Sequence, residues 1–439
     1  FSGKLVQQLD DVSDLSVKLH YYNEDTSSTY TGLTQSLYDS NYLSNPATSD
    51  KLYVERFGVS LIHKYYGIED SELTSLLYAH QSKRYWWRQD YDLTADSGTT
   101  YIRETKVNDV TQIYWKNSNG GRNRVYKVVG FEPRFETKEY TIGTRLHYEL
   151  EDNKRVNGSF PSARTGTIKS DEERSTLAAS LYGNYHYTFG KLTLTPGVRL
   201  EAINQRRQVH TSTETIPGST GLDIEVIPGI GLTYDYNDSV NIFAGVHRGF
   251  APPKFSDAID SDGVDQKLEA ERSMNFEAGT RLNLTNWLQS NITAFYYDYS
   301  NQVIAASESS GYSKANGGKS LSQGVEIDFQ ATGTDILIDN AQWTGSLATA
   351  YVNATFKDAD RQGKRIPYVP QGTLTASLGF SHPLGIDLFS EAVYSSSMFS
   401  DEDNTVKGSA NGKVGLIPSH TIFNVNGKYK LDENWNVFG

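Results

Sequence analysis

The chain has no cysteine among its 439 residues. This absence excludes a disulfide framework, a cysteine-ligated zinc or iron–sulfur site and a thiol nucleophile. Acidic residues outnumber basic ones, 53 to 41, which argues against the basic face that nucleic acid requires. No apolar run reaches the roughly 18 residues of a transmembrane helix, and the first residues do not have the pattern of a signal peptide. A soluble multidomain enzyme and a single large β-barrel both remain open at this point.

Tyrosine is abundant, with 29 copies, and convincing amphipathic helical patterns are missing. Instead, apolar and polar residues alternate along many segments, such as 192–200, 325–330 and 374–381. Successive side chains of a strand point to opposite faces, so each of these segments predicts a strand with one apolar and one polar face. The predicted fold class is therefore all-β.

The alternation predicts 16 strands and the start of another, many of them longer than the roughly 9–11 residues with which a tilted strand crosses a bilayer. The expected strands are 12–23, 52–66, 71–87, 123–136, 138–150, 173–188, 190–207, 222–235, 239–250, 271–284, 286–303, 320–332, 341–356, 370–382, 385–399 and 418–430, with the partial strand beginning near 434. A strand count of this size would also suit a passive porin.

The connections between these strands alternate in length. Short turns are expected at 67–70, 188–191, 236–239, 285–287, 383–385 and 431–434, and long polar loops at 24–51, 88–122, 151–172, 208–221, 251–270, 304–319, 357–369 and 400–417. Bacterial outer-membrane barrels have tight turns at one edge of the sheet and long loops at the other, whereas sandwiches and propellers have shorter strands. We therefore expect a transmembrane antiparallel up-and-down β-barrel.

Aromatic residues gather at the expected strand ends, where they would lie at the level of the lipid headgroups. These residues are Tyr65, Tyr66, Tyr85, Trp86, Trp87, Tyr185, Tyr187, Tyr234, Tyr236, Trp287 and Trp435. The first and last residues of the chain both have the character of strand interior. The sequence is therefore expected to be a fragment of a larger barrel.

The phrases GVHRGFAPPKF at residues 245–255 and LEAERSMNFEAGTR at residues 268–281 resemble those of TonB-dependent outer-membrane receptors. Residues 245–255, GVHRGFAPPKF, resemble the family's phrase that leads from a strand into the substrate-facing loop. Residues 268–281, LEAERSMNFEAGTR, are similar to its motif L-x-P/A-E-x-S-x-N-x-E-x-G-x-R, and 294–299 and 323–329 continue it at the expected spacing. The ferric citrate receptor branch is resembled by 397–406, SMFSDEDNTV, and by 131–135, 194–199, 409–412 and 415–418.

The resemblance covers essentially the whole chain and implies a barrel of about 22 strands. On this basis residues 1–439 are a barrel domain truncated at both ends, with about 16–17 strands present, and the plug domain and TonB box lie outside the sequence. It implies active uptake of a ferric chelate, most closely ferric dicitrate, energised by the TonB-ExbB-ExbD complex through the plug. The implied location is the outer membrane of a Gram-negative bacterium, where lipid and lipopolysaccharide surround the barrel. Neither an enzyme nor a cofactor is implied, because the chelate itself carries the iron.

A site for an anionic citrate complex needs cationic, fork-shaped donors on the outer loops, and arginine suits this role. The expected loop 88–122, its flanking strand ends and the next long loop concentrate arginine among aromatic residues. The candidate ligand-binding residues are Arg84, Arg88, Arg103, Arg122 and Arg164, and Arg124 and Arg155 lie beside them. For Arg164, the resemblance adds a ligand-contacting arginine in the same loop region. Contact with lipopolysaccharide phosphates, or simple solvation, is the alternative for each arginine.

Other polar groups have simpler explanations. The acidic segment 257–265 has its glycine too early for a calcium loop and is expected to be a solvated loop. His147 and His247 are expected to be hydrogen-bonded strand residues, and Glu326 and Asp328 to lie on a polar lumen face. The family's ligand-contacting glutamine has no clear counterpart in 305–311, which leaves another siderophore, an oligosaccharide or a metallophore as alternative cargo. No P-loop, nucleophile elbow or dinucleotide fingerprint is found, so an enzyme is not expected.

Overall fold

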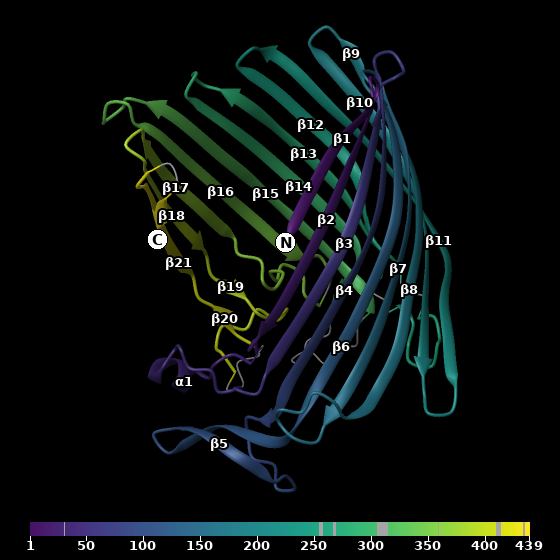
Figure 1. The fold of residues 1–439 in the computed structure, drawn as a ribbon, viewed down its shortest axis with the longest axis vertical. Helices are drawn as coiled ribbons and strands as arrows, with labels where there is room; N and C mark the ends of the chain where they lie inside the picture. Colours follow the sequence, from purple (N-terminus) through teal and green to yellow (C-terminus); the bar gives the residue numbers. More distant parts are fainter. Residues whose placement is uncertain are drawn as a thin grey trace. The chain divides into compact units, whose positions relative to one another are not determined.

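The computed structural model describes residues 1–29, 31–253, 258–266, 269–304, 315–358, 360–409, 414–432 and 435–439. In these residues the chain forms β-strands and one short helix (Figure 1). The elements are β1 (Ser2–Asp10), β2 (Ser13–Thr26), α1 (Gln35–Ser40), β3 (Lys51–Tyr65), β4 (Ser71–Asp92), β5 (Tyr101–Val107), β6 (Val110–Thr137), β7 (Tyr140–Gly158), β8 (Thr167–Tyr185), β9 (Tyr187–Phe189), β10 (Leu192–His210), β11 (Thr215–Asn237), β12 (Val240–Ala251), β13 (Glu271–Asn283), β14 (Leu288–Ile304), β15 (Ala315–Thr334), β16 (Gln342–Phe356), β17 (Gly372–His382), β18 (Ile386–Ser395), β19 (Met398–Phe399), β20 (Leu416–Ile417), β21 (His420–Lys430) and β22 (Asn436–Phe438).

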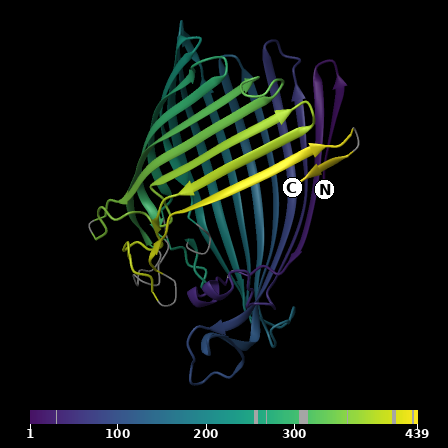
Figure 2. The same ribbon diagram turned by 90° about the vertical axis from the view of Figure 1, so that its left-hand side faces the viewer.

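The chain divides into two compact units. The first comprises residues 1–184, 198–226 and 254–268, and in it β1, β2, β3, β4, β6 and β7 pair antiparallel in that order. The second comprises residues 185–197, 227–253 and 269–439, and its strands pair in the same way from β11 to β18 and on to β21 and β22. Figure 2 shows the last of these, coloured green to yellow, side by side. The predicted all-β, antiparallel, up-and-down fold is confirmed.

The two faces of the first unit's sheet differ in chemistry. Val17, Leu61, Leu77, Phe131 and Leu146 lie opposite one another in a row across five strands. Phe131 and Leu146 keep 41% and 52% of their surface exposed, which a soluble sheet would avoid but a lipid-facing one requires. We call this side the apolar face. No helix in the described part of the chain is long and apolar enough to cross a membrane.

The neighbouring row, one residue along each strand, points the other way and is polar. It contains Lys18, Ser60, Tyr78, Gly130 and His147, again opposite one another on the same five strands. The Tyr78 hydroxyl lies 2.8 Å from His147 Nδ1 across the strand that Gly130 occupies. We call this side the polar face, and in an outer-membrane barrel it is the side that lines the interior.

Three of the expected loops are wrong in extent, because strands continue into them. β4 runs to Asp92 and β6 begins at Val110, so most of 88–122 is strand, and β5 pairs with the start of β6. Only 159–166 separates β7 from β8, and only 211–214 separates β10 from β11. Beyond the membrane both faces of a strand meet water or loops, so the apolar–polar alternation fades although the backbone pairing persists. Likewise, β1 is a full strand that the alternation did not show.

A small hydrophobic core fastens the connection between β2 and β3 to the hairpin of β5 and β6. Leu37 of α1 and Ala47 pack with Ile113 and Trp115 of the hairpin. Neither Ile113 nor Trp115 has any exposed surface. The Trp115 indole donates a 2.8 Å hydrogen bond to the Thr105 hydroxyl. Both α1 and β5 accordingly lie at the same end of the first unit's strands in Figure 1.

Replacing Trp115 with alanine should release this hairpin without unfolding the sheet. The substitution removes a fully buried indole, a loss of about 3–5 kcal/mol, which exceeds the stability expected of a four-residue core. We expect cleavage between residues 93 and 116 by a brief trypsin treatment. The matched control is Trp287→Ala, whose ring is 50% exposed and whose loss should leave the digestion pattern unchanged. Resistance of Trp115→Ala to trypsin would contradict the proposed role of this core.

Candidate functional site

Four arginines of β4, β6 and β7 meet on the polar face, close to the middle of β6 and toward the ends of β4 and β7 that carry the long loops. Arg84 lies directly opposite Arg124, and Arg122 lies directly opposite Arg155. Because Arg122 and Arg124 are two residues apart on β6, both pairs project from the same side of the sheet. Directly opposite side chains have Cβ atoms about 5 Å apart. The register thus produces a compact group of guanidinium groups that could bind an anion together.

Trp86 anchors this group on β4. The guanidinium carbons of Arg84 and Arg88 lie 5.0 and 4.9 Å from the centre of its ring, within range for cation–π contact. The indole nitrogen donates a 3.0 Å hydrogen bond to the backbone oxygen of Ser28. Trp86 is therefore fixed in place, and it holds two arginines that point along the same face.

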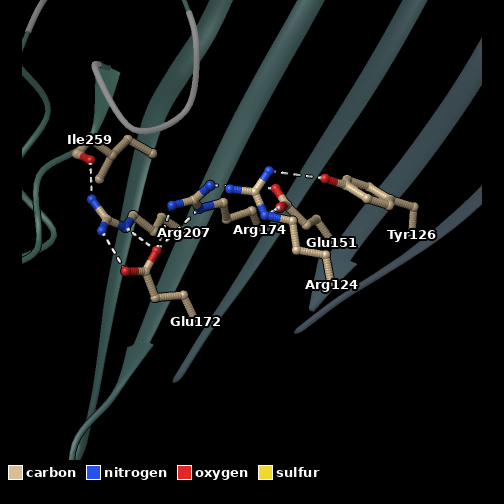
Figure 3. Close-up of polar contacts among 7 residues, drawn as sticks. All are labelled: Arg124, Tyr126, Glu151, Glu172, Arg174, Arg207 and Ile259. Carbon is tan, nitrogen blue, oxygen red and sulfur yellow. Dashed lines mark hydrogen bonds and ion pairs between the residues drawn. The ribbon is translucent and has the colours of Figure 1, made fainter. Parts of the chain in front are cut away.

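A chain of charge-assisted hydrogen bonds extends the site from β6 toward β10 (Figure 3). Arg124 lies 3.5 Å from Glu151 of β7, and Glu151 is 3.4 Å from Arg174 of β8. Arg174 also donates to Glu172 on its own strand at 2.8 Å. Arg124 in addition donates to the Tyr126 hydroxyl at 3.3 Å. Each glutamate is thus shared, which lets neighbouring arginines lie close without direct repulsion.

The chain ends at Arg207 of β10, which is 7% exposed. Its guanidinium donates to both oxygens of Glu172, at 3.2 and 2.9 Å, and to the backbone oxygen of Ile259 at 2.6 Å. The last bond ties the connection between β12 and β13 to the first unit's sheet, since all three residues belong to that unit. Figure 3 shows these groups following one another from Ile259 to Tyr126, with Glu172 beside Arg207 and Arg174.

The cationic groups exceed the carboxylates that accompany them. Arg124, Arg174 and Arg207 share two glutamates. Within the described part of the chain, Arg84 and Arg155 lie within ion-pair distance of no carboxylate, and Arg155 is exposed. The site therefore keeps positive charge available for an anionic ligand, and guanidinium groups bind carboxylates with two parallel hydrogen bonds.

Asp50 is a buried acid that the sequence alone did not point to. It precedes β3, is 1% exposed, and accepts a 2.8 Å hydrogen bond from the backbone nitrogen of Gln89. Burial raises the pKa of this carboxyl, while the Gln89 bond and the charges of Arg88 and Arg164 oppose the rise. Asp50 partly neutralises these two arginines, so the unpaired positive charge lies nearer to Arg84 and Arg155.

Two of the predicted ligand residues lie in other surroundings. Arg103 stacks on Trp115 at 4.7 Å and donates to the backbone oxygen of Pro46, and its burial lowers its pKa. Arg164 donates to the backbone oxygens of Ala163 and Ser49 and lies 3.5 Å from the Tyr53 hydroxyl. Both therefore hold loops together. Whether Arg164 also contacts a ligand stays a prediction, as it does for Arg84, Arg88, Arg103 and Arg122.

The other sequence candidates behave as hydrogen-bonded structural groups. His147 bonds Tyr78, and the His247 ring bonds Asn275 at 3.1 Å. The carboxylate of Asp328 on β15 accepts a 3.0 Å hydrogen bond from the side-chain amide of Asn291 on β14. Asp260 closes a turn by accepting backbone bonds, and the described residues contain no group of three or more metal-ligating side chains. Residues 254–257 and 305–311 lie outside the described part.

Glu172→Gln should destabilise the protein strongly, because it removes the charge that Arg174 and Arg207 share. Breaking one partner out of a buried ion pair costs about 3 kcal/mol or more, and all three side chains are at most 13% exposed. We expect a clear fall in the thermal unfolding temperature, measured by circular dichroism during heating. The control Glu136→Gln alters a half-exposed pair with Arg134 and should change little. Equal effects of the two substitutions would argue against the network.

Known proteins resemble this chain along its whole length. A family profile described as TonB dependent receptor-like, beta-barrel, matches residues 6–439. The solved structure of the ferric citrate transporter FecA in its unliganded form superposes with a TM-score of 0.80 at 21% identity, covering all of this chain and 63% of that one. The ferric yersiniabactin uptake receptor FyuA from Yersinia pestis gives 0.73 at 14% identity, with 100% and 64% coverage. The siderophore receptor PiuA from Acinetobacter baumannii gives 0.68 at 14% identity, with 100% and 68% coverage.

At these identities the structural likeness concerns the fold, and this chain spans 63% of the length of the ferric citrate transporter. The match to the family profile is broader, since it covers nearly every residue. Proteins of this family are outer-membrane receptors of Gram-negative bacteria and not enzymes, which agrees with the expected location and the expected lack of catalysis. The chain belongs to the TonB dependent receptor-like β-barrel family.

Proposed function

We propose that the full-length protein binds a ferric chelate rich in carboxylates, most closely ferric dicitrate, at its outer mouth and imports it. The observation that carries this proposal is that two arginine pairs lie opposite each other on adjacent strands: Arg84 faces Arg124, and Arg122 faces Arg155. They lie on the polar face between the middle of β6 and the loop ends of β4 and β7, where a ligand arriving from outside would meet the interior. The resemblance of 397–406 to the ferric citrate branch points the same way.

The chemistry of the ligand fits the residues present. Citrate oxygens fill the coordination shell of the iron, so the protein need supply hydrogen-bond donors and not metal ligands. Two opposed guanidinium pairs match a complex that displays several carboxylates, and each charged hydrogen bond contributes about 1.5–3 kcal/mol. Trp86 offers an aromatic surface beside them, held by Ser28 and stacked on Arg84.

Energy for import would come from the partners that the family resemblance implies. We propose that the TonB-ExbB-ExbD complex acts through a plug domain that fills the barrel. The barrel wall would then supply the ligand site, and lipid and lipopolysaccharide would surround its apolar face. A passive channel is the alternative, and liposome swelling separates the two: the full-length receptor should not let small sugars pass freely.

The double substitution Arg84→Ala with Arg155→Ala tests the proposed site. It removes two cations that have no carboxylate partner among the residues that the structure describes, so it should leave the fold intact. It should weaken binding at least about tenfold, because each charged bond lost costs roughly 1.4 kcal/mol or more. The measurement is quenching of tryptophan fluorescence in the full-length receptor during titration with ferric dicitrate.

The matched control is Arg134→Ala, on the same strand as Arg122 and Arg124 but at its turn end. It should leave the affinity unchanged. Arg164→Ala, made in parallel, tests the remaining sequence-based prediction, and an unchanged affinity would remove Arg164 from the ligand set. Wild-type receptor that shows no saturable quenching would overturn the citrate assignment, whereas equal affinities of the wild type and the double variant would overturn the proposed site.

A further inference from the structure

Two histidines face each other across a glycine on the polar face of the first unit. His20 of β2 lies opposite Gly58 of β3, and Gly58 lies opposite His80 of β4. The three residues therefore share one row across three adjacent strands. Both histidines are exposed, while Gly58 is buried.

Gly58 is buried because the His20 ring lies on top of it. A Cβ atom placed on Gly58 would be 2.1 Å from His20 Cε1, 2.6 Å from Nε2 and 2.9 Å from Nδ1. Any side chain at position 58 would thus collide with the imidazole. The missing side chain lets the His20 ring lean sideways over β3 toward β4 instead of standing upright above its own strand.

This lean brings the two imidazoles together. Adjacent strands are about 4.8 Å apart, so side chains on β2 and β4 would otherwise be separated by a full strand. The His20 ring occupies the Cβ position of Gly58, and the Cβ of a directly opposite residue lies about 5 Å from that position. His80 is that residue. Zinc–imidazole bonds of about 2.0–2.1 Å let one ion join nitrogens up to roughly 4 Å apart.

We propose that His20 and His80 form a two-imidazole site for a divalent transition-metal ion such as Cu²⁺, Ni²⁺ or Zn²⁺. Imidazole is a preferred ligand of these ions. Water would complete the coordination shell, because the exposed rings open into the interior. Arg56 lies on the same face, two residues before Gly58, and its charge keeps the affinity moderate. The site is separate from the arginine group, since four residues of β4, about 13 Å, divide His80 from Arg84.

The site can be measured with Cu²⁺ on the untagged full-length receptor, purified in detergent and freed of metal. Titration calorimetry should show one Cu²⁺ site in the wild type, and electron paramagnetic resonance should show coupling to two nitrogens. His20→Ala and His80→Ala should each lower the affinity at least tenfold. His63→Ala is the matched control, because His63 lies on β3 but on its apolar face, and its loss should have no effect. Wild-type affinity in both histidine variants would overturn the proposal.

Gly58→Ala tests the geometry while keeping both ligands. The added methyl group must push the His20 ring aside, so Cu²⁺ affinity should fall about as far as in His80→Ala. Gly98→Ala is the control, since a Cβ there meets nothing within 4 Å. Unchanged two-nitrogen coupling in Gly58→Ala would contradict the assigned arrangement. If that variant does not assemble, His80→Ala decides, because it removes only an exposed side chain. Neither experiment uses ferric dicitrate, so failure here would not bear on the proposed chelate uptake.

Discussion

Antiparallel strand pairing is the constraint on which the rest of the structure depends. In hydrocarbon every backbone N–H and C=O group must find a partner within the protein, and paired strands satisfy this requirement without any helix. Once pairing fixes the register, the two-residue period of the strand decides which side chains meet. Successive side chains point to opposite faces, so the row from Val17 to Leu146 faces lipid and the row from Lys18 to His147, one residue along, faces the interior. The register of strand pairing therefore decides, as much as composition does, which side chains lie together in a binding site.

The arginine group follows from that register at an energetic cost. Guanidinium groups with little exposure, such as that of Arg207, are stable only when carboxylates and backbone oxygens accept their hydrogen bonds. Glu151 and Glu172 serve this role for three arginines, so the part of the site near β8 and β10 is held in place and most of its positive charge is balanced. Among the described residues, no carboxylate pairs with Arg84 or Arg155 near β4 and β7. Under the proposed function, an incoming anion would meet fixed arginines whose positive charge is uncompensated on this side.

The sequence predicted much of this, with limits that have physical reasons. Apart from β1, strands were found where lipid faces one side, because alternation is strong there. Loops were overestimated where strands continue beyond the membrane, as at 88–122. Arg84 and Arg122 stay predicted ligand residues, and their positions opposite Arg124 and Arg155 depend on register, which no single segment encodes. Glu151 and Glu172 were missed for the same reason. Arg103 looks like a ligand residue in sequence, but the packing of Trp115 decides its position.

Glycine on the polar face has a related effect, because it lets a side chain cross a strand. His20 lies over Gly58, and Tyr78 lies over Gly130 to reach His147. Such crossings create contacts between strands that are not neighbours, which pairing alone cannot do. They also separate two kinds of chemistry on one face: guanidinium groups bind carboxylates and leave metals alone, whereas imidazoles bind metals. A chelate whose iron is enclosed by citrate oxygens would engage the arginines and pass the histidines, while a bare divalent ion would do the reverse.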